Sequence, residues 1–395
     1  MQSSAALSWN SLQPAFGLDD FLGPAPSWSP ASWRRFREWF HAGGWPWFGP
    51  MDALDDVMPW GRSTLVTRPG SGSNFEPNDP VGGGSRKVDF YHLPVLLPEV
   101  VELLKPEAGK LIFDGTLGGG GHSEAMLQHG ARVVAMDQDE EALRHARLRL
   151  GGYGDRFVSL HGNFRDMSQI LAETGVSGFD AMLVDIGVSS RQLDDPTRGF
   201  SFQGDGPLDL RMDRSRALTA ADLVQSAGVD ELTRIFRDYG EEPSAWKIAN
   251  AIVDARAVLP ITTTARLVEV VEKASPRRGK RHPATLVFQA LRIAVNDELG
   301  ALEDFLAEAP KWLKPGGRLG IISFHSLEDR LVKRAFQRLS TEWLDRPEWP
   351  EPKRNPEFCL NLVTRKVVVP SAAEIEVNPR SRSARLRVAE RPSSP

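Results

Sequence analysis

The sequence predicts an α/β protein built on a parallel sheet, with a helical insertion and an N-terminal extension that lacks regular structure. From residue 92 onward, short apolar runs of strand length alternate with helical periods, which is typical of a parallel sheet covered on both faces. Between residues 198 and 300 the strand-like runs stop and helical periods take over. Residues 1–85 show no persistent period of either kind.

The N-terminal extension, residues 1–85, contains 10 prolines, 11 glycines and 7 of the 11 tryptophans of the chain. Proline and glycine at this density interrupt helices and strands, so we expect a mostly disordered segment. The tryptophans leave two interpretations open. The region around Trp28–Trp47 could dock a partner, or the extension could be a lineage-specific tail, including sequence upstream of the true start.

The predicted sheet follows from five apolar runs with the length of buried strands, several of which end in Asp or Gly. They are Leu111–Asp114, Arg132–Asp137, Arg156–His161, Phe179–Asp185 and Arg318–Ser323. Two later runs, Leu362–Val369 and Ala384–Ala389, could add edge strands. We therefore expect a discontinuous sheet domain formed by residues 86–197 and 301–395.

The insertion, residues 198–300, is predicted to be a helical substrate-recognition domain. Ala245–Val258 has a helical period with Pro260 just beyond its end. Phe288, Leu291, Val295, Glu298 and Leu302 fall on one helical face. About a hundred helical residues between two strands of one sheet are typical of a lid or a substrate domain.

Composition excludes several classes of protein. The single cysteine, Cys359, cannot form an internal disulfide or a cysteine-based zinc site, and it favours a reducing compartment. No apolar run is long enough to span a bilayer, and no signal-peptide pattern is present, so we expect a soluble, cytoplasmic protein. The net charge of −4 means that any nucleic-acid binding needs local basic patches.

The strongest local motif is the glycine-rich turn Asp114–Ser123, which follows a predicted strand and precedes a helical stretch. Glycines there allow a sharp turn and a close approach of the backbone to a ligand at a helix N-terminus. The spacing fails the dinucleotide fingerprint and the P-loop pattern. The turn looks like that of S-adenosylmethionine enzymes. Asp137, at the end of the next strand, could bind the two hydroxyls of a ribose.

Two further motifs follow predicted strands and should reach the same edge of the sheet. Asp185–Leu193 supplies a carboxylate, Ser189 and Ser190, all candidates for accepting a proton from a substrate. Ser323–Arg330 contains His325, which is either a proton acceptor or a structural side chain. The histidines contain no His-Glu-x-x-His motif, so we predict no metal site.

Candidate nucleic-acid contacts form two basic clusters and one aromatic pair. Phe200 and Phe202 could stack on a base, with core packing as the alternative. The cationic side chains could bind phosphates, although charge runs are often only solvated loops. The first cluster is Arg277, Arg278, Lys280 and Arg281, and the second is Arg380, Arg382, Arg385 and Arg387.

Nine motifs in order, over roughly residues 90–392, closely resemble the ribosomal RNA small-subunit methyltransferase H family, also called MraW. Residues 1–85 match nothing in the family pattern. The matching pieces are His92–Leu97, Asp114–Ser123, Asp185–Leu193, Arg198–Phe202, Gly206–Met212, Tyr239–Glu242, His282–Thr285 with Phe288–Ala290, Ser323–Arg330 and Asn378–Ser383.

The resemblance implies a class I, Rossmann-like methyltransferase sheet with an inserted helical domain. It implies methyl transfer from S-adenosylmethionine to the exocyclic N4 of one cytidine in the decoding centre of 16S rRNA. The implied partner is 16S rRNA within the small ribosomal subunit, and a homodimer is left open. Arg191, where the family often has proline, departs from the pattern beside one implied contact. The implied cofactor contacts are Gly120, Gly121, His122, Asp137, Phe164, Asp185 and Gln192.

Two other functions compete with this interpretation. A class I methyltransferase acting on a small molecule or a protein would explain the glycine turn and Asp137, but not the basic clusters. A non-catalytic RNA-binding or ribosome-assembly protein could keep the cofactor fold without turnover. The intact carboxylates Asp114, Asp137 and Asp185 argue against such a loss of activity.

Overall fold

A computed structural model describes residues 93–276 and 282–393 of the chain. The predictions of a disordered extension at residues 1–85 and of a docking segment around Trp28–Trp47 lie outside the described residues. The basic cluster of Arg277, Arg278, Lys280 and Arg281 also lies outside them.

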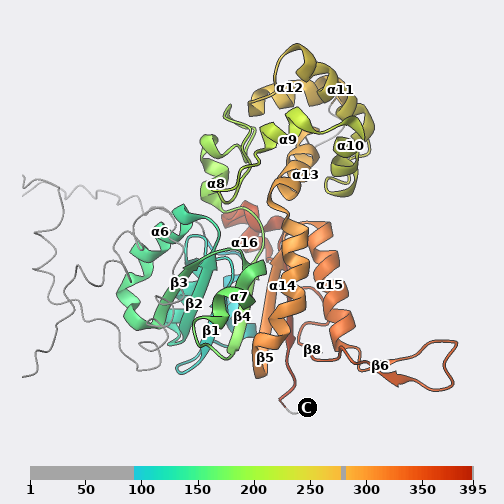
Figure 1. Cartoon of the computed structure of the whole chain (residues 1–395). Helices are drawn as coiled ribbons and strands as arrows, with labels where there is room; N and C mark the ends of the chain where they lie inside the picture. The colour runs from blue at the N-terminus through green and yellow to red at the C-terminus, as the bar shows by residue number, and fades with distance from the viewer. Residues whose placement is uncertain (1–92, 277–281, 394–395) are drawn as a thin grey trace, which may run out of the picture.

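The core of the described protein is a seven-stranded sheet with the strand order β3-β2-β1-β4-β5-β9-β8. The first five strands are parallel, β9 is antiparallel to β5, and β8 is antiparallel to β9. A separate two-stranded ribbon, β6-β7, projects from the body (Figure 1). The strands are β1 (Leu111–Asp114), β2 (Arg132–Asp137), β3 (Phe157–His161), β4 (Phe179–Asp185), β5 (Leu313–Ser323), β6 (Trp343–Leu344), β7 (Lys353–Arg354), β8 (Asn361–Leu362) and β9 (Arg385–Glu390).

The predicted strands agree closely with the observed ones where the apolar run is continuous. The bounds of β1, β2 and β4 are those predicted, and β3 begins one residue later. Strand β5 begins five residues earlier, because Leu313 also pairs with Phe179 of β4, and a shift of register separates this pair from the next one, Ala181 with Arg318. The edge strand predicted at 362–369 was wrong in extent, since only Asn361–Leu362 forms a strand there.

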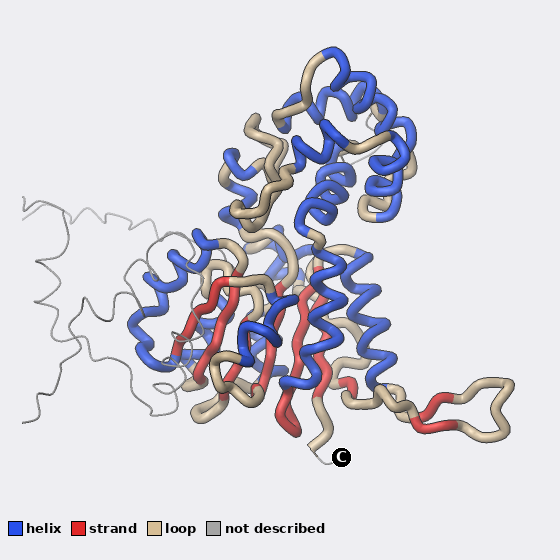
Figure 2. The backbone as a smooth tube through the Cα atoms, in the orientation of Figure 1, coloured by secondary structure: helices blue, strands red, loops and turns tan. Residues whose placement is uncertain are grey.

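Side chains of the central strands alternate between two faces of the sheet, as the two-residue period requires. On one face Phe113 and Val184 pack against α7, α14 and α15. On the other face Ile112 and Leu183 pack against α4, α5 and α6. Figure 2 shows the strands between these helical layers. The result is a three-layer α/β core of the class predicted.

The helices are short, and none among the described residues is long and apolar enough to cross a membrane. They are α4 (Leu97–Leu104), α5 (Gly121–Gln128), α6 (Glu140–Leu150), α7 (Met167–Ala172), α8 (Ser190–Asp194), α9 (Ala220–Ser226), α10 (Val229–Asp238), α11 (Ala245–Val258), α12 (Thr264–Ala274), α13 (Ala284–Asn296), α14 (Glu298–Trp312), α15 (Ser326–Ser340) and α16 (Ala372–Val377). Short 3-10 turns lie at Gly151–Arg156, Phe164–Asp166, Pro196–Arg198 and Pro379–Ser383.

Helices α9–α13 form a unit with its own hydrophobic cluster, drawn from residues between Phe200 and Val295. In Figure 1 this unit stands above the sheet, at the end where β4 leads into α8. The separate cluster supports the predicted division at residues 198–300, which we retain as a proposal. The unit is therefore placed over the carboxyl edge of the parallel strands.

A break between α13 and α14 corrects the expectation of one continuous helical face from Phe288 to Leu302. Asp297 adopts a left-handed conformation, with φ 51° and ψ 46°, and separates the two helices. Just before it, the side chain of Asn296 donates to the carbonyl of Leu210 over 2.7 Å and accepts from the Met212 amide over 2.8 Å. These contacts join the break to the loop over the strand ends.

We predict that Gly206→Ala destabilises the helical unit, because an added Cβ would lie 2.0 Å from the carbonyl oxygen of Pro196. Overpacking of this kind costs about 1–3 kcal/mol. Gly204→Ala is the matched control, since a Cβ there meets nothing within 4 Å. Urea unfolding of both variants and the wild type measures the difference. Equal midpoints for the two variants would show that the loop relaxes freely.

Candidate functional site

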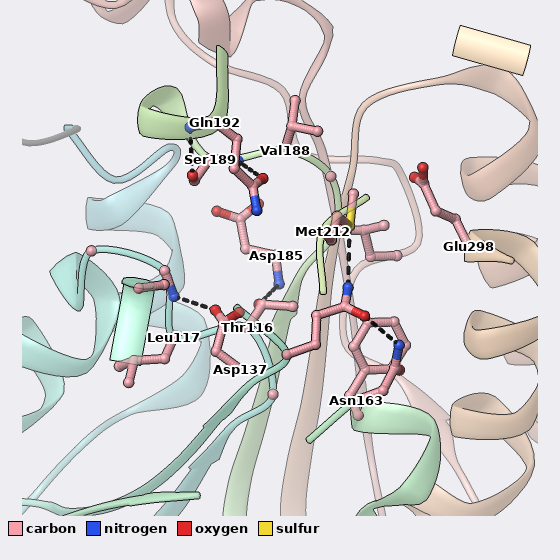
Figure 3. Close-up of a pocket in the computed structure, with 18 of the residues that line it drawn as sticks. Thr116, Leu117, Asp137, Asn163, Asp185, Val188, Ser189, Gln192, Met212 and Glu298 are labelled. Atoms are coloured by element: carbon pink, nitrogen blue, oxygen red, sulfur yellow. Dashed lines mark hydrogen bonds between the residues drawn. The ribbon is translucent and has the colours of Figure 1, made fainter. Parts of the chain in front are cut away.

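One cavity lies at the carboxyl edge of the sheet, where the loops after β1, β2, β3, β4 and β5 meet. Its volume is about 1070 Å³, including the open space at its mouth. Figure 3 shows Asp137, Asp185 and Gln192, which come from different loops, around this common space. The α13–α14 break also contributes, through Asn296 and Glu298. The cavity thus joins the sheet to the base of the helical unit.

The glycine-rich turn forms one wall of the cavity. Gly120 has φ +79°, and its amide donates to the carbonyl of Leu117 over 2.8 Å, which closes the turn before α5. A Cβ at Gly121 would lie 3.0 Å from Pro94 Cγ, so only glycine fits without a shift. Gly121 and Leu117 line the cavity, whereas Gly120 lies just behind it. The predicted cofactor turn is therefore a close-packed backbone cradle.

Asp114 and Asp137 end the two strands beside this turn, and both have few charge partners. Ser123 Oγ donates to Asp114 over 2.6 Å. Asp137 accepts from the amides of Gly118, at 2.7 Å, and Asp139, at 2.8 Å. Burial raises the pKa of each carboxyl to about 6, although these hydrogen bonds oppose the shift. Of the two, only Asp137 lines the cavity, in a position suited to a ligand hydroxyl pair.

Asp185 and His122 face each other across the cavity floor. The backbone amide of Asp185 donates toward no carbonyl; it bonds instead to Thr116 Oγ1 over 2.7 Å. Its Oδ1 is buried and has no hydrogen-bond partner among the described residues. Burial, followed by the nearby charges of Asp114 and Glu328, raises the pKa of Asp185 well above its usual value. Asp185 is thus a buried carboxyl with a free acceptor atom.

His122 is held so that it stays neutral. Its Nε2 lies 2.9 Å from the carbonyl of Val95, and its Nδ1 lies 3.8 Å from Asp185 Oδ2. Burial lowers the pKa of His122 to about 4. A carbonyl only accepts, so the Nε2 carries the proton and the Nδ1 lone pair faces Asp185. The imidazole therefore stays neutral beside Asp185 and does not neutralise the charge of that carboxylate.

Gln192 and Ser189 belong to the capping box that begins α8. The Ser189 amide donates to Gln192 Oε1 over 3.0 Å, and the Gln192 amide donates back to Ser189 Oγ over 3.2 Å. Both residues line the cavity, as predicted. Ser190, the first residue of α8, does not line the cavity. Arg191 is a neighbour of Glu141 at 3.8 Å and leaves the Gln192 geometry intact.

Phe164 and two polar residues that sequence reasoning missed form the wall after β2 and β3. Phe164 lines the cavity and packs edge-on against Phe305, with ring centroids 5.5 Å apart. Asn163 donates to Gln138 Oε1 over 2.9 Å, and Gln138 lies against the sulfur of Met212. Gln138 and Asn163 stand one and two residues beyond a strand end, a position that could have identified them.

His325 lies behind the cavity rather than in its lining, which does not support the predicted role as proton acceptor. It caps α15, and its Nε2 lies 2.9 Å from Glu328 Oε1 in an ion-pair contact. Glu298 holds Arg292 through two contacts of 2.8 Å in the same buried region. Burial opposes the ionisation of Glu328, but its hydrogen bond with His325 and the charges of His325 and Arg292 together lower its pKa. His325 is therefore part of a buried charge network.

This network also brings together one ligand atom each from Glu298, His325 and Glu328, all within 4.8 Å of one another. Sequence spacing gave no sign of it, because the residues come from α14 and α15. Both oxygens of Glu298 are already bonded to Arg292, whose charge balances one carboxylate. The absence of a metal site stays a prediction.

Phe200 and Phe202 belong to the core of the helical unit, so the structure supports the core-packing alternative. Phe200 is buried there, and the Phe202 ring lies 5.1 Å from that of Phe288 and 4.9 Å from that of His282. Neither phenylalanine lines the cavity. Sequence could not decide this, because aromatic spacing does not show which way a loop side chain points.

The second basic cluster is partly neutralised by acidic neighbours. Arg380 pairs with Asp194, the last residue of α8, and Arg387 pairs with Asp329 of α15. Arg385 lies 3.3 Å from the same Asp329 carboxylate. Arg382 is exposed on the turn before β9. Arg380 and Arg382 are both exposed and remain predicted RNA contacts.

Comparison with known proteins gives strong matches along the sequence. The model of the MraW methylase family matches residues 89–392. Ribosomal RNA small subunit methyltransferase H of Carboxydothermus hydrogenoformans is 49% identical over 307 residues, which cover 77% of this chain and 99% of that protein. The protein of the same name from Anaeromyxobacter sp. is 49% identical over 307 residues, covering 77% and 98%.

A solved rRNA methylase from Streptococcus thermophilus shares 11% identity and covers 75% of this chain and 93% of its own, with a TM-score of 0.33. That overlap is too weak to support an argument, and the assignment rests on the sequence matches. The predicted family, its class I sheet and its S-adenosylmethionine cofactor are confirmed. From residue 89 to residue 392, the chain belongs to the MraW methylase family.

Proposed function

We propose that this protein transfers a methyl group from S-adenosylmethionine to the exocyclic N4 of a cytidine in the decoding centre of 16S rRNA. The observation that carries the proposal is the unpartnered Oδ1 of Asp185, which lies in the same cavity as the glycine turn and Asp137. The names of the relatives, which specify the small ribosomal subunit RNA, support the substrate. The assembled subunit is the proposed partner, and a homodimer and a cytoplasmic location stay predictions.

The cavity fits the chemistry of the cofactor. S-adenosylmethionine, when bound, supplies a methyl group on a positively charged sulfur. Asp137 would bind the ribose hydroxyls, and the glycine backbone from Gly118 to Gly121 would follow the rest of the nucleoside. Phe164 and Gln192 would complete the pocket, with Asp185 close to the positive charges. Asp137 and Asp185 line the cavity, and no lysine or arginine is among the described lining residues, which favours a cationic ligand.

The reaction requires the amine of the base to lose a proton and its nitrogen to align with the methyl group. The nitrogen lone pair is delocalised into the ring, so an acceptor for the N–H group assists the attack. Asp185 Oδ1 is buried and free to accept that hydrogen. His122, kept neutral by burial, lies beside Asp185 without compensating the charge of the carboxylate. Alignment in a closed cavity supplies roughly 7–11 kcal/mol of the acceleration.

The target cytidine must leave its base stack to enter the cavity, because the amine cannot reach Asp185 inside a helix. The helical unit stands above the end of the sheet where β4 leads into α8 (Figure 1) and would bind the surrounding RNA. Phosphate contacts from Arg382 and from the cluster at residues 277–281 are part of the proposal. Local patches, rather than the net charge of −4, would then hold the RNA.

The direct test is methyl transfer from labelled S-adenosylmethionine to small ribosomal subunits that lack the modification, followed by nucleoside analysis. We expect the label in N4-methylated cytidine. Label in another nucleoside would contradict the proposed target while keeping methyl transfer to RNA. Cofactor binding without any transfer would favour the non-catalytic RNA-binding alternative.

We predict that Asp185→Asn lowers kcat by about 10²–10⁴-fold, because the amide no longer takes up a proton. Ser190→Ala is the control, since Ser190 does not line the cavity and should retain nearly all activity. Single-turnover rates on unmodified subunits measure both variants. A near-normal rate for Asp185→Asn would remove the carboxylate from proton transfer, and a large loss in Ser190→Ala would restore that serine as a candidate.

We predict that S-adenosylmethionine binding weakens as the pH falls through about 6. Without ligand, the pKa values of Asp114 and Asp137 are about 6 and that of Asp185 is well above its usual value. A cationic ligand binds better when these carboxyl groups are ionised. At low pH, binding must therefore displace protons from them, and the affinity reaches its maximum only above these pKa values. Calorimetric Kd values between pH 8 and pH 5.5 provide the measurement. A constant Kd over this range would refute the prediction.

A further inference from the structure

An aromatic residue beside Asp185 has no role in the site as described so far. Among the described residues that line the cavity, the aromatic ones are Phe164 and Phe324. The usual amino-methyltransferase signature, Asp/Asn-Pro-Pro-aromatic, places its aromatic residue just after the fourth strand, but this chain has Gly187 and Val188 there. The aromatic surface near the target amine must therefore come from another strand.

Phe324 follows β5, the strand adjacent to β4. Asp185 is paired with Ile322, and the Ile186 amide donates to the Ile322 carbonyl over 2.9 Å. Two residues beyond that pair, Gly187 and Phe324 lie side by side. A Cβ at Gly187 would lie 3.5 Å from Phe324 Cδ2, so the ring covers the glycine backbone next to Asp185. Gly187 lies two residues beyond the end of β4, and the ring of Phe324 lies beside it at an ordinary contact distance.

Phe164 is on the other side of the cavity and cannot take the same role. It follows β3, which is separated from β4 by β2 and β1 in the sheet. It is buried and packs against Phe305, and a Cβ at Gly115 would lie 3.2 Å from its Cβ. Phe164 is therefore fixed beside the glycine turn, on the cofactor side. Phe324 is only partly buried and stands on the side of the proposed proton acceptor.

The buried charge network behind the cavity fixes the backbone of Phe324. Glu328 Oε2 accepts from the amide of Phe324 over 2.8 Å and from the amide of His325 over 3.2 Å. Glu328 is 1% exposed and is held in turn by the imidazole of His325. Glu328 thus completes the capping box of α15 and, through the amide of Phe324, also fixes the chain that leaves β5. His325 and Glu328 are thus positioning residues for Phe324.

We infer that Phe324 is the platform on which the target base stacks when its amine reaches Asp185. This inference rests on the function proposed above and adds the residue that selects a planar base. An aromatic ring stacks on any base, at about 1–3 kcal/mol for each base. The ring and the acceptor oxygen lie at adjacent strand ends, so a stacked base presents its edge, and with it the exocyclic amine, to Asp185.

The test compares Phe324→Leu with Phe324→Tyr in the full-length protein. Leucine keeps an apolar side chain and removes the aromatic face, whereas tyrosine keeps the face. With unmodified small subunits and saturating S-adenosylmethionine, kcat/KM should fall about 5- to 150-fold for Phe324→Leu and remain within about threefold for Phe324→Tyr. The Kd for S-adenosylmethionine, measured by calorimetry, should stay within about twofold for both variants, since the ring lies outside the cofactor side.

Three results would overturn the inference. Wild-type activity in Phe324→Leu would show that no base stacks there, and equal losses in both variants would indicate a packing role. A parallel rise in the Kd for S-adenosylmethionine would place Phe324 in the cofactor site. The proposed function is tested separately by the wild-type product. If the wild type methylates another nucleoside, that function fails, and the comparison of leucine with tyrosine still applies to the base that is modified.

Discussion

The buried ion pair between Asp139 and Arg198 is the constraint that joins the cofactor side of the site to the helical unit. Arg198 is 1% exposed, and it donates to Asp139 over 2.8 Å and to the carbonyl of Met212 over 2.9 Å. Asp139 also accepts from Gln192 over 2.8 Å. A charge buried to this extent is stable only when it is paired and hydrogen-bonded. These contacts fix the loop over the cavity, although Arg198 Nε is buried without a hydrogen-bond partner among the described residues.

This constraint explains how residues distant in sequence form one wall. Arg198 fixes the loop that ends at Met212, and Asn296 binds the same loop from the α13–α14 break. Asp297 turns the chain there, so that Glu298 begins α14 at the cavity. The helical unit is consequently attached to the sheet through groups that also line the site. A change in the position of this unit would change the shape of the cavity.

The sequence was sufficient to predict the parts of the site that follow strands. Asp137 and Asp185 each end an apolar run, and parallel strands bring their carboxyl ends to one edge. Met212 and Glu298 could not be predicted, because their positions depend on Arg198 and on the helix break. Phe202 and Phe324 both stand in loop motifs, and the sequence around them does not show which of the two lines the cavity. Only the packing of the helical unit shows that the first belongs to its core.

The electrostatic design of the site follows from the same arrangement. Asp114, Asp137 and Asp185 are carboxyls at three neighbouring strand ends, and the basic side chain nearest to them, His122, is kept neutral by burial. Arg198 is paired with Asp139, and Arg292 is paired with Glu298. Neither arginine therefore cancels the charge of the three strand-end carboxyls. A positively charged methyl donor would relieve the repulsion among the carboxyls, whereas a neutral product would not. Charge therefore supports a positively charged methyl donor as the ligand of this cavity, in agreement with the function proposed above.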